Sequence, residues 1–486
     1  MITWRSLALL LTLTASCAPG SGEELPGEEW SGHLTPDPLK ARKKPCAPGV
    51  SLLSDIRSGP VGSRPRELVV AGGQLFFTAE DGRSGRELWK STGSHGGGTV
   101  RVKDLRPGAA TSNPRRLTEV SDKLFFTADD GLSGRELWVS DGTAEGTVLV
   151  KDIYPGSIGS APDHLVAFEG VLYFAANDGV NGTELWRSDG TRDGTFMVED
   201  LFPGQDETQP GRPGSSSPRR LTRAGDALYF VAQRGSTQSL WRHTGGAAST
   251  SVFSAPLSAF VFSLTAAGPD LFYLVDEGHG VTGLWWTRNV PARQLRTFTG
   301  QYPHDLIAVG KQLFFSAGDE DGDELWTSDG SVVGTVQVKD IQHGQPGSSP
   351  SALVELGKQV LFAAEEGSRG RELWTTDGTA RGTALARELE SGSGGSSPQE
   401  LTAILGTLFF SADTAGRGRE LWMSDGSTEG TVPVADIAPG AASSNPSGFV
   451  RSGAEVYFIA TNATHGEELW MLPLRSGLEC RGFSDD

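Results

Sequence analysis

A glutamate stands directly before a Leu-Trp pair at seven places in the chain, and repeated carboxylates raise the question of acid-base chemistry. The seven are Glu87, Glu136, Glu184, Glu324, Glu372, Glu420 and Glu468. General acid-base catalysis needs carboxylates that meet at one site, whereas these return at near-regular intervals along most of the chain. A carboxylate repeated in this way more often accepts hydrogen bonds from backbone N–H groups or from arginine. The pattern therefore predicts a structural role, and we assign no catalytic residue.

The segment AGDEDGDELW brings four acidic residues together, Asp319, Glu320, Asp321 and Asp323. Calcium prefers clustered carboxylate oxygens. The spacing, however, does not match the calcium-loop pattern D-x-[DN]-x-[DN]-G-x₅-E. We interpret the segment as a solvated acidic turn, with a weak calcium site at Asp319, Asp321 and Asp323 as the alternative, and we expect no other cofactor.

The sequence lacks other catalytic and metal-binding patterns. Its eight histidines show neither HExxH nor Cys-His ligand spacing, which argues against zinc. Neither a G-x-S-x-G string nor a phosphate-binding loop occurs. The net charge is -18 and no basic face is visible, so nucleic acid is not an expected partner.

The N-terminal segment MITWRSLALLLTLTASC is typical of a secretion signal. It has one arginine, a short apolar run from Leu7 to Leu13, and small residues up to Cys17, and it is too short to span a bilayer. The TASC end resembles a bacterial lipoprotein signal, in which the cysteine is acylated, although Thr14 stands where an apolar residue is usual. Ordinary cleavage after Ala18 is the alternative. We predict a signal peptide at 1–16, and a lipid-attachment site at Cys17 with a flexible linker at 17–47.

The Leu-Trp pair marks an internal repeat. Its tryptophans are Trp89, Trp138, Trp186, Trp241, Trp285, Trp326, Trp374, Trp422 and Trp470. The intervals between them run from 41 to 55 residues, and four of the eight are 48. One unit, residues 112–156, divides at Gly and Asp turn signals into four short strand-like runs. Four strands per period of this length predict an all-β fold, a single closed β-propeller of nine four-stranded blades over residues 48–486. We expect a monomer.

The two ends of the repeat array complement each other. The ninth unit stops after its third strand, and residues 51–65 match the fourth strand and loop at 148–162. We therefore predict that the N-terminal strand completes the last blade, which leaves no unpaired gap. This pairing would bring Cys46 and Cys480 to the same end of the blade. If Cys17 carries lipid, these two cysteines form an even pair, and we predict a disulfide between them, with two free thiols as the alternative.

Two further repeated features have structural interpretations. The recurring tryptophan is expected to fill the space between neighbouring blades, with its indole N–H hydrogen-bonded. The Ser-Asp-Gly-Thr turns, of which Asp141 and Asp189 are examples, are predicted to be tight hairpins. In such a turn, aspartate bonds its own backbone while glycine takes a positive φ.

The consensus G-x-E-L-W-x-S-D-G-T-x-x-G-T-x-x-V-K-D-I-x-P-G resembles the ELWxxDGT repeat family of exported bacterial proteins. The resemblance covers residues 51 to 474, and at least five units carry most of the motif. It implies a repeat-built, propeller-like exported protein and no settled activity. Units four and five depart from the consensus, with Ser239 and Gly283 in place of the glutamate.

Because repetition encodes the scaffold, we expect function where repetition fails. The loops after the second and fourth strands of each blade open on one face. We assign to this face three irregular features: the loop at 203–220, the acidic turn with Asp319, Asp321 and Asp323, and the altered blades with His279 and Trp286. We predict an exported, lipid-anchored, non-enzymatic scaffold that binds an envelope or extracellular protein or a glycan, either as an outer-membrane lipoprotein or secreted. The membrane would be contacted only through the lipid. The alternative is a secreted hydrolase or lyase acting on a polysaccharide.

Overall fold

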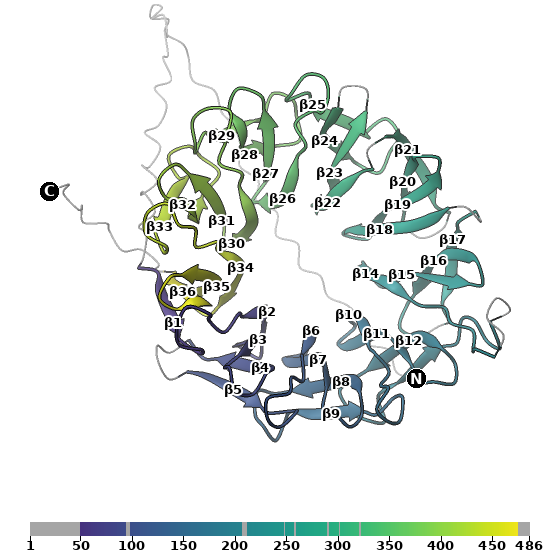
Figure 1. Cartoon of the computed structure of the whole chain (residues 1–486). Coiled ribbons are helices and arrows are strands. Elements are labelled where there is room, and N and C mark those ends of the chain that lie inside the picture. The colour runs from purple at the N-terminus through teal and green to yellow at the C-terminus, as the bar shows by residue number, and fades with distance from the viewer. Residues whose placement is uncertain are drawn as a thin grey trace, which may run out of the picture. The chain divides into compact units, whose positions relative to one another are not determined.

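The computed structural model describes residues 49–474, with gaps at 94–97, 207–210, 247, 257–258, 289–290, 301 and 320–321. All of the described residues belong to the unit that spans residues 44–486. Their 36 strands form nine four-stranded antiparallel sheets, arranged around a central opening as the blades of a β-propeller (Figure 1). The predicted fold class is confirmed. The predicted lipid site at Cys17 and the predicted disulfide between Cys46 and Cys480 lie outside the described residues.

Each blade is an up-and-down meander whose first strand lines the central opening. The first three blades that are continuous in sequence comprise β2 (Arg66–Ala71), β3 (Gln74–Glu80), β4 (Arg86–Ser91) and β5 (Thr99–Lys103); β6 (Arg115–Val120), β7 (Lys123–Asp129), β8 (Arg135–Ser140) and β9 (Val148–Lys151); and β10 (Asp163–Phe168), β11 (Val171–Asn177), β12 (Thr183–Ser188) and β13 (Phe196–Glu199). The next three comprise β14 (Arg219–Ala224), β15 (Ala227–Arg234), β16 (Thr237–His243) and β17 (Thr250–Ser254); β18 (Phe260–Ala267), β19 (Asp270–Gly278), β20 (Val281–Thr287) and β21 (Arg293–Thr299); and β22 (His304–Val309), β23 (Gln312–Asp319), β24 (Gly322–Ser328) and β25 (Val336–Lys339). The last three comprise β26 (Ser351–Leu356), β27 (Gln359–Glu366), β28 (Gly370–Thr376) and β29 (Ala384–Arg387); β30 (Gln399–Ile404), β31 (Thr407–Thr414), β32 (Gly418–Ser424) and β33 (Val432–Ala435); and β34 (Ser447–Ser452), β35 (Glu455–Asn462) and β36 (Gly466–Pro473), which β1 (Ser51–Ser54) completes.

The second strand of each blade is apolar on both faces because it lies between two neighbouring sheets. Leu75, Phe76 and Phe77 of β3 are at most 1% exposed. The core is accordingly divided into clusters between adjacent blades. In one of them Phe76 packs with Phe126 and Trp138 of the next blade.

The ring closes through its two ends, as predicted. β1 pairs antiparallel with β36, with Leu52 opposite Trp470. The inner strands β34 and β2 also contact each other, as do all the other pairs of successive inner strands. No helix in the described part of the chain is long and apolar enough to cross a membrane.

The predicted aspartate bonds and glycine conformation of the Ser-Asp-Gly-Thr turns are confirmed, but residues 141–147 form a seven-residue connection and not a tight hairpin. Asp141 Oδ1 accepts hydrogen bonds of 2.8 Å from both the N–H and the hydroxyl of Thr143. Gly142 has a φ of 90°. The connection also bonds the preceding blade, because the Lys103 ammonium donates to the Thr147 carbonyl at 2.8 Å.

The prediction for the repeated tryptophans is only partly confirmed. Trp138, Trp186 and Trp374 are among those buried between blades. The indole N–H groups of Trp326 and Trp470 donate to the carbonyls of Ala317 and Ala460 at 3.1 Å. For five others the expectation of a hydrogen-bond partner is wrong, because the buried indole nitrogen has none among the described residues: Trp89, Trp138, Trp186, Trp285 and Trp374. Packing, not hydrogen bonding, is the shared role of this residue.

Candidate functional site

The glutamates before Leu-Trp are buried hydrogen-bond acceptors. Glu468 accepts a 2.8 Å bond from the Ser63 N–H, a 2.6 Å bond from the Ser63 hydroxyl and a 3.1 Å bond from the Arg57 N–H. The same glutamate-serine pairing recurs in seven blades, and we call it the Glu-Ser latch. Its pairs are Glu87–Ser112, Glu136–Ser160, Glu184–Ser216, Glu324–Ser348, Glu372–Ser396, Glu420–Ser444 and Glu468–Ser63.

The latch is a structural device. Every one of its glutamates is at most 2% exposed, and burial raises the pKa of each, that of Glu184 to about 7. The bonded serine lies in the loop that leads to the next blade, so the latch fixes that loop to the third strand. The predicted structural role is confirmed, with serine and backbone donors in place of arginine.

The two blades without the glutamate lack the latch and have other polar side chains at its position. In β14–β17, the Ser239 and Ser254 hydroxyls are 3.1 Å apart. In β18–β21, Glu277 near the end of β19 accepts a 2.6 Å bond from the Gln294 amide of β21. A Cβ added at Gly283 would lie 2.4 Å from Glu277 Oε1. A carboxylate from another strand thus fills the space above this glycine.

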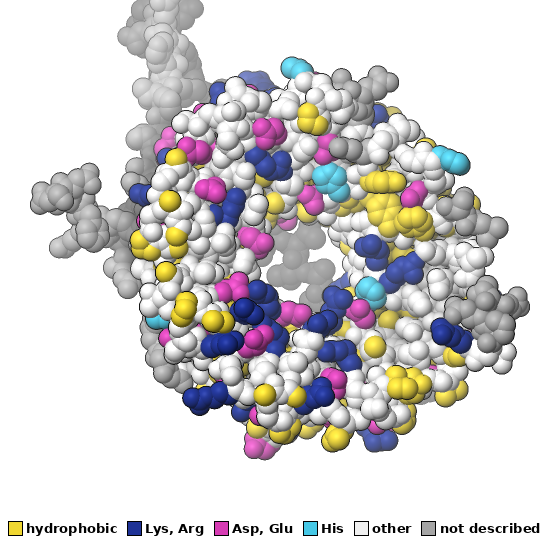
Figure 2. All heavy atoms as spheres, in the orientation of Figure 1, with side chains coloured by type: hydrophobic (Ala, Val, Ile, Leu, Met, Phe, Trp, Pro, Cys, Tyr) yellow, Lys and Arg dark blue, Asp and Glu magenta, His cyan; other side chains and the backbone are white. Residues whose placement is uncertain are grey.

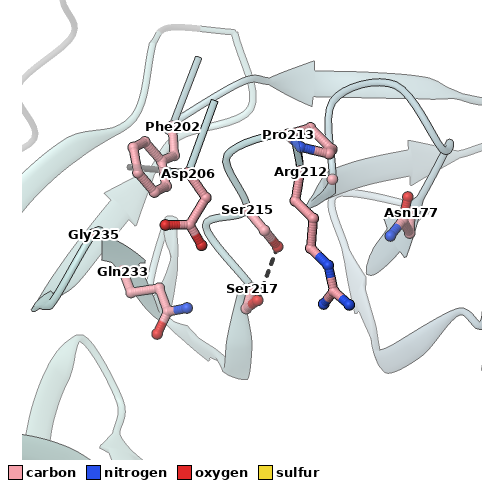
Figure 3. A pocket seen from close by; sticks show the side chains of 10 residues that line it. Asn177, Phe202, Asp206, Arg212, Pro213, Ser215, Ser217, Gln233 and Gly235 are labelled. Carbon is pink, nitrogen blue, oxygen red and sulfur yellow. Dashed lines mark hydrogen bonds between the residues drawn. The ribbon is translucent and has the colours of Figure 1, made fainter. Parts of the chain in front are cut away.

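A cavity of about 300 Å³ opens between the blades β10–β13 and β14–β17 (Figure 3). We call it the loop pocket, and its lining residues are Asn177, Gly182, Phe202, Asp206, Arg212, Pro213, Ser215, Ser217, Gln233 and Gly235. Six of the ten belong to the enlarged connection at 202–217 between β13 and β14. The others come from the ends of β11 and β15 and from the hairpins that follow these strands. The irregular loop that the sequence singled out therefore builds a cavity.

Backbone hydrogen bonds fold the enlarged connection back on itself. The Asp206 N–H donates to the Arg212 carbonyl at 2.9 Å, and the Gly214 N–H donates to the Gly204 carbonyl at 2.8 Å. A Cβ at Gly214 would lie 2.1 Å from the Phe202 carbonyl oxygen, so only glycine fits there. The base of the loop is held by the Ser216–Glu184 latch.

The polar side chains of the pocket have an ordered placement (Figure 3). The Ser215 and Ser217 hydroxyls, 3.0 Å apart, form its middle. The Asp206 carboxylate lies to one side of this pair and the Arg212 guanidinium to the other (Figure 3). The lining therefore contains a carboxylate and a guanidinium group, each with a partner within the protein, on either side of two neutral hydroxyls.

His279 and Trp286 do not share a face. His279 is exposed in the turn between β19 and β20. Trp286 stands near the far end of β20, where its ring lies 4.3 Å from the Arg293 guanidinium and packs against Gly330. Placing Trp286 on the binding face was wrong, because a strand of this length carries its last residues roughly 17 Å or more from the preceding turn.

Only part of the acidic turn lies within the described residues. Asp321 and the side chain of Asp319 lie outside the described residues. Asp323 is 2% exposed, and its Oδ2 lies 3.0 Å from His304 Nε2. Hydrogen bonds to Asp305 and Asp323 raise the pKa of His304 to about 9. Asp323 is thus a buried ion-pair partner and not a residue of a solvated turn. Within the described ranges, no group of three or more His, Cys, Asp or Glu side chains could hold a metal ion.

Sequence reasoning found the loop of the pocket but missed its other wall. Asn177 and Gln233 stand on strands of two different blades, and neither breaks the repeat pattern. Aligning the repeats blade against blade would have shown that both strand ends face the enlarged loop.

Comparisons with known proteins extend only to the fold. No family model matches the chain, and no curated protein matches it. Similar solved structures include a prolyl endopeptidase, with 13% identity and a TM-score of 0.42, covering 72% of this chain and 54% of that one. A puromycin-hydrolyzing peptidase of Mycobacterium tuberculosis has 12% identity and a TM-score of 0.35, with coverages of 76% and 61%. An acylaminoacyl peptidase of Pyrococcus horikoshii has 11% identity and a TM-score of 0.36, with coverages of 82% and 57%. The chain spans a little over half the length of these proteins.

The expected function has to be corrected. The sequence was interpreted as that of a non-enzymatic binding or structural scaffold, with a polysaccharide hydrolase or lyase as the alternative. All three solved structures come from peptidases, and neither expectation agrees with them, so neither is carried further. The likeness is one of fold and assigns no peptidase activity to this chain.

Proposed function

We propose that this propeller binds a small zwitterion, an amino acid or a molecule of similar size and charge, in the loop pocket. The observation that carries the proposal is the placement of the Asp206 carboxylate and the Arg212 guanidinium on either side of the Ser215–Ser217 pair (Figure 3). Both side chains already have partners within the protein, so the ammonium and carboxylate groups of a ligand would bind beside those contacts. Such charge-assisted contacts are stronger than neutral ones.

The size of the cavity supports a small ligand. A volume of about 300 Å³ is at the lower end of ligand pockets. It equals roughly ten water molecules at about 30 Å³ each, so a molecule of roughly ten non-hydrogen atoms fits. Phe202 supplies an apolar surface for a side chain, and the Asn177 and Gln233 amides supply further polar contacts.

The test is calorimetric titration of the full chain with free amino acids and with their N-acetyl amides, which carry neither end charge. We expect saturable binding of one or more free amino acids and binding at least about tenfold weaker for the blocked forms. The double variant Asp206→Asn/Arg212→Gln, which keeps the backbone bonds of the loop, should lose affinity by a similar factor.

The matched control is Asp193→Asn/Arg192→Gln. These two residues are exposed in the turn between β12 and β13, at the far end of the blade from the pocket. The control should bind as the unmodified chain does. Saturation by no amino acid, or equal binding of free and blocked forms, contradicts the proposal.

A further inference from the structure

The inner strands begin with the same local geometry in eight of the nine blades. The second residue of each has a positive φ, and the pairing register shifts immediately after the first residue. The residues at this position are Glu67, Arg116, His164, Arg220, Asp305, Ala352, Glu400 and Gly448. They form a ring of equivalent positions at the entrance to the central opening. Since Ala352 and Gly448 fit this position as well as charged residues do, the fold does not require a charge there.

Charges are unevenly distributed around this ring. Three successive blades carry Arg116, His164 and Arg220. Across the ring, the same position carries Asp305 and Glu400. Figure 2 shows Lys and Arg side chains gathered along one part of the rim of the opening, over the blades that begin with β2, β6, β10 and β14. We call Arg116, Arg220 and Arg219, the first residue of β14, the cationic arc, and His164 lies among them.

The acidic positions of the ring have partners in the scaffold. Glu67 accepts a 3.1 Å bond from the N–H of Leu117 in the next blade, and Asp305 accepts a 3.3 Å bond from that of Ala352. In the cationic arc, Arg116 pairs with Asp163 at 2.8 Å. In the described part of the chain, no hydrogen bond or ion pair holds the side chains of Arg219 and Arg220. The named acidic side chains are therefore bonded within the scaffold, whereas Arg219 and Arg220 have no such bond among the described residues.

The members of the arc lie close enough to repel one another. Burial lowers the pKa of His164, and the charges of Arg116, Arg220 and Arg219 lower it further, against the opposing effect of Asp163. Arg220 is exposed and Arg219 half-buried. Both guanidinium groups are therefore within reach of a ligand.

We infer that the cationic arc binds an acidic polypeptide segment, whose carboxylates pair with Arg219 and Arg220. The planar guanidinium fork matches a carboxylate with two parallel hydrogen bonds. The residues of this site do not line the loop pocket, so the inference about peptide binding does not depend on the proposed function.

The experiment measures fluorescence anisotropy of a labelled octaglutamate peptide with the full chain at low salt. The variant Arg219→Ser/Arg220→Ala copies the Ser351–Ala352 pair that begins β26, so its backbone geometry already exists in this fold. We expect this variant to bind about tenfold or more weakly, and octaglutamine not to bind. Affinity for octaglutamate should fall as NaCl is added, because salt screens exposed charges.

The control is Arg83→Ser/Arg417→Ala, which removes the same charge from exposed hairpins on two other blades. It should bind octaglutamate as tightly as the unmodified chain. Equal losses in both variants, or no loss in Arg219→Ser/Arg220→Ala, would overturn the inference. So would equal or tighter binding of an eight-nucleotide single-stranded DNA, since the site would then be one for phosphate.

Discussion

The seven blades that carry the Glu-Ser latch differ from the two that lack it in how each blade holds its connecting loop. In a latched blade, one buried carboxylate satisfies several donors of the loop. In β14–β17 a pair of serine hydroxyls occupies the position of the carboxylate. In β18–β21 Glu277 occupies it, but bonds Gln294 of the outer strand and not the connecting loop. The motif that repeats therefore serves the scaffold. The loop pocket and the cationic arc both include β14 or its approach, where the repetition fails.

The largest effect is expected from Glu372→Ala in a latched blade. The substitution leaves the N–H groups of Leu389, Glu390 and Ser396 without an acceptor in a buried place. Each unsatisfied buried group costs about 1 to 3 kcal/mol, so we expect a loss of about 4 kcal/mol or more in the free energy of unfolding. Urea unfolding measures this loss of free energy. Ser239→Ala, at the equivalent position of an unlatched blade, should cost less than about 1 kcal/mol. Equal costs would break the distinction between the two kinds of blade.

Glu184→Gln should remove a pH dependence of stability. Burial raises the pKa of Glu184 from its ordinary 4.5 to about 7. The folded chain thus binds this proton more tightly than the unfolded chain does. The resulting stability is present below pH 4.5 and is lost as the pH rises through 7, at up to about 1.4 kcal/mol per pH unit.

Glu184→Gln cannot ionise, so its free energy of unfolding should lack the fall of about 2 to 3 kcal/mol that we expect for the unmodified chain between pH 4.5 and pH 8. One amide NH2 faces donors that bond the carboxylate, so the comparison is of the pH profiles and not of the absolute stabilities. Urea unfolding from pH 4.5 to pH 8 measures the difference. Glu145→Gln, in an exposed turn, is the control and should leave the pH profile unchanged. A variant profile parallel to that of the unmodified chain contradicts this account of Glu184.

Restoring the consensus glutamate at Gly283 should destabilise the protein. Its Cβ would lie 2.4 Å from Glu277 Oε1 and 2.7 Å from Gln294 Nε2, and its carboxylate would meet that of Glu277. Overpacking of this kind costs about 1 to 3 kcal/mol. Thermal unfolding of Gly283→Glu, with and without Glu277→Gly, measures the cost. Unchanged or higher stability of the single variant would show that Glu277 does not fill the space beside Gly283.

The smallest effect is expected at the exposed turns. Asp141→Ala removes two 2.8 Å bonds to Thr143, at a site open to water, and should cost about 1 kcal/mol or less in the free energy of unfolding. Urea unfolding of this variant beside Glu372→Ala ranks the two repeated carboxylates. A larger cost for Asp141→Ala would reverse that ranking.

The fold could be predicted because each blade carries its own turn residues and the repeat returns about every 48 residues. The ring closure followed from the missing strand of the ninth unit. The position of Trp286 could also have been predicted by counting from the turn at His279 to the far end of β20. The cationic arc could not be recognised from the sequence. Arg116 and Arg220 are about a hundred residues apart, and the net charge of -18 gives no sign of a local positive patch.

The most direct test of the central claim, that the irregular loop binds the ligand while the latch holds the scaffold, replaces residues 202–215 by the regular loop YPGSIG of residues 154–159. Ser216 and Glu184 stay in place, so the latch is kept. Titration with the amino acid that binds most tightly to the unmodified chain is then compared with thermal unfolding of both chains. We predict that binding is lost while the unfolding temperature changes by no more than a few degrees. Binding that survives the replacement, or a ring that no longer folds, would contradict the account.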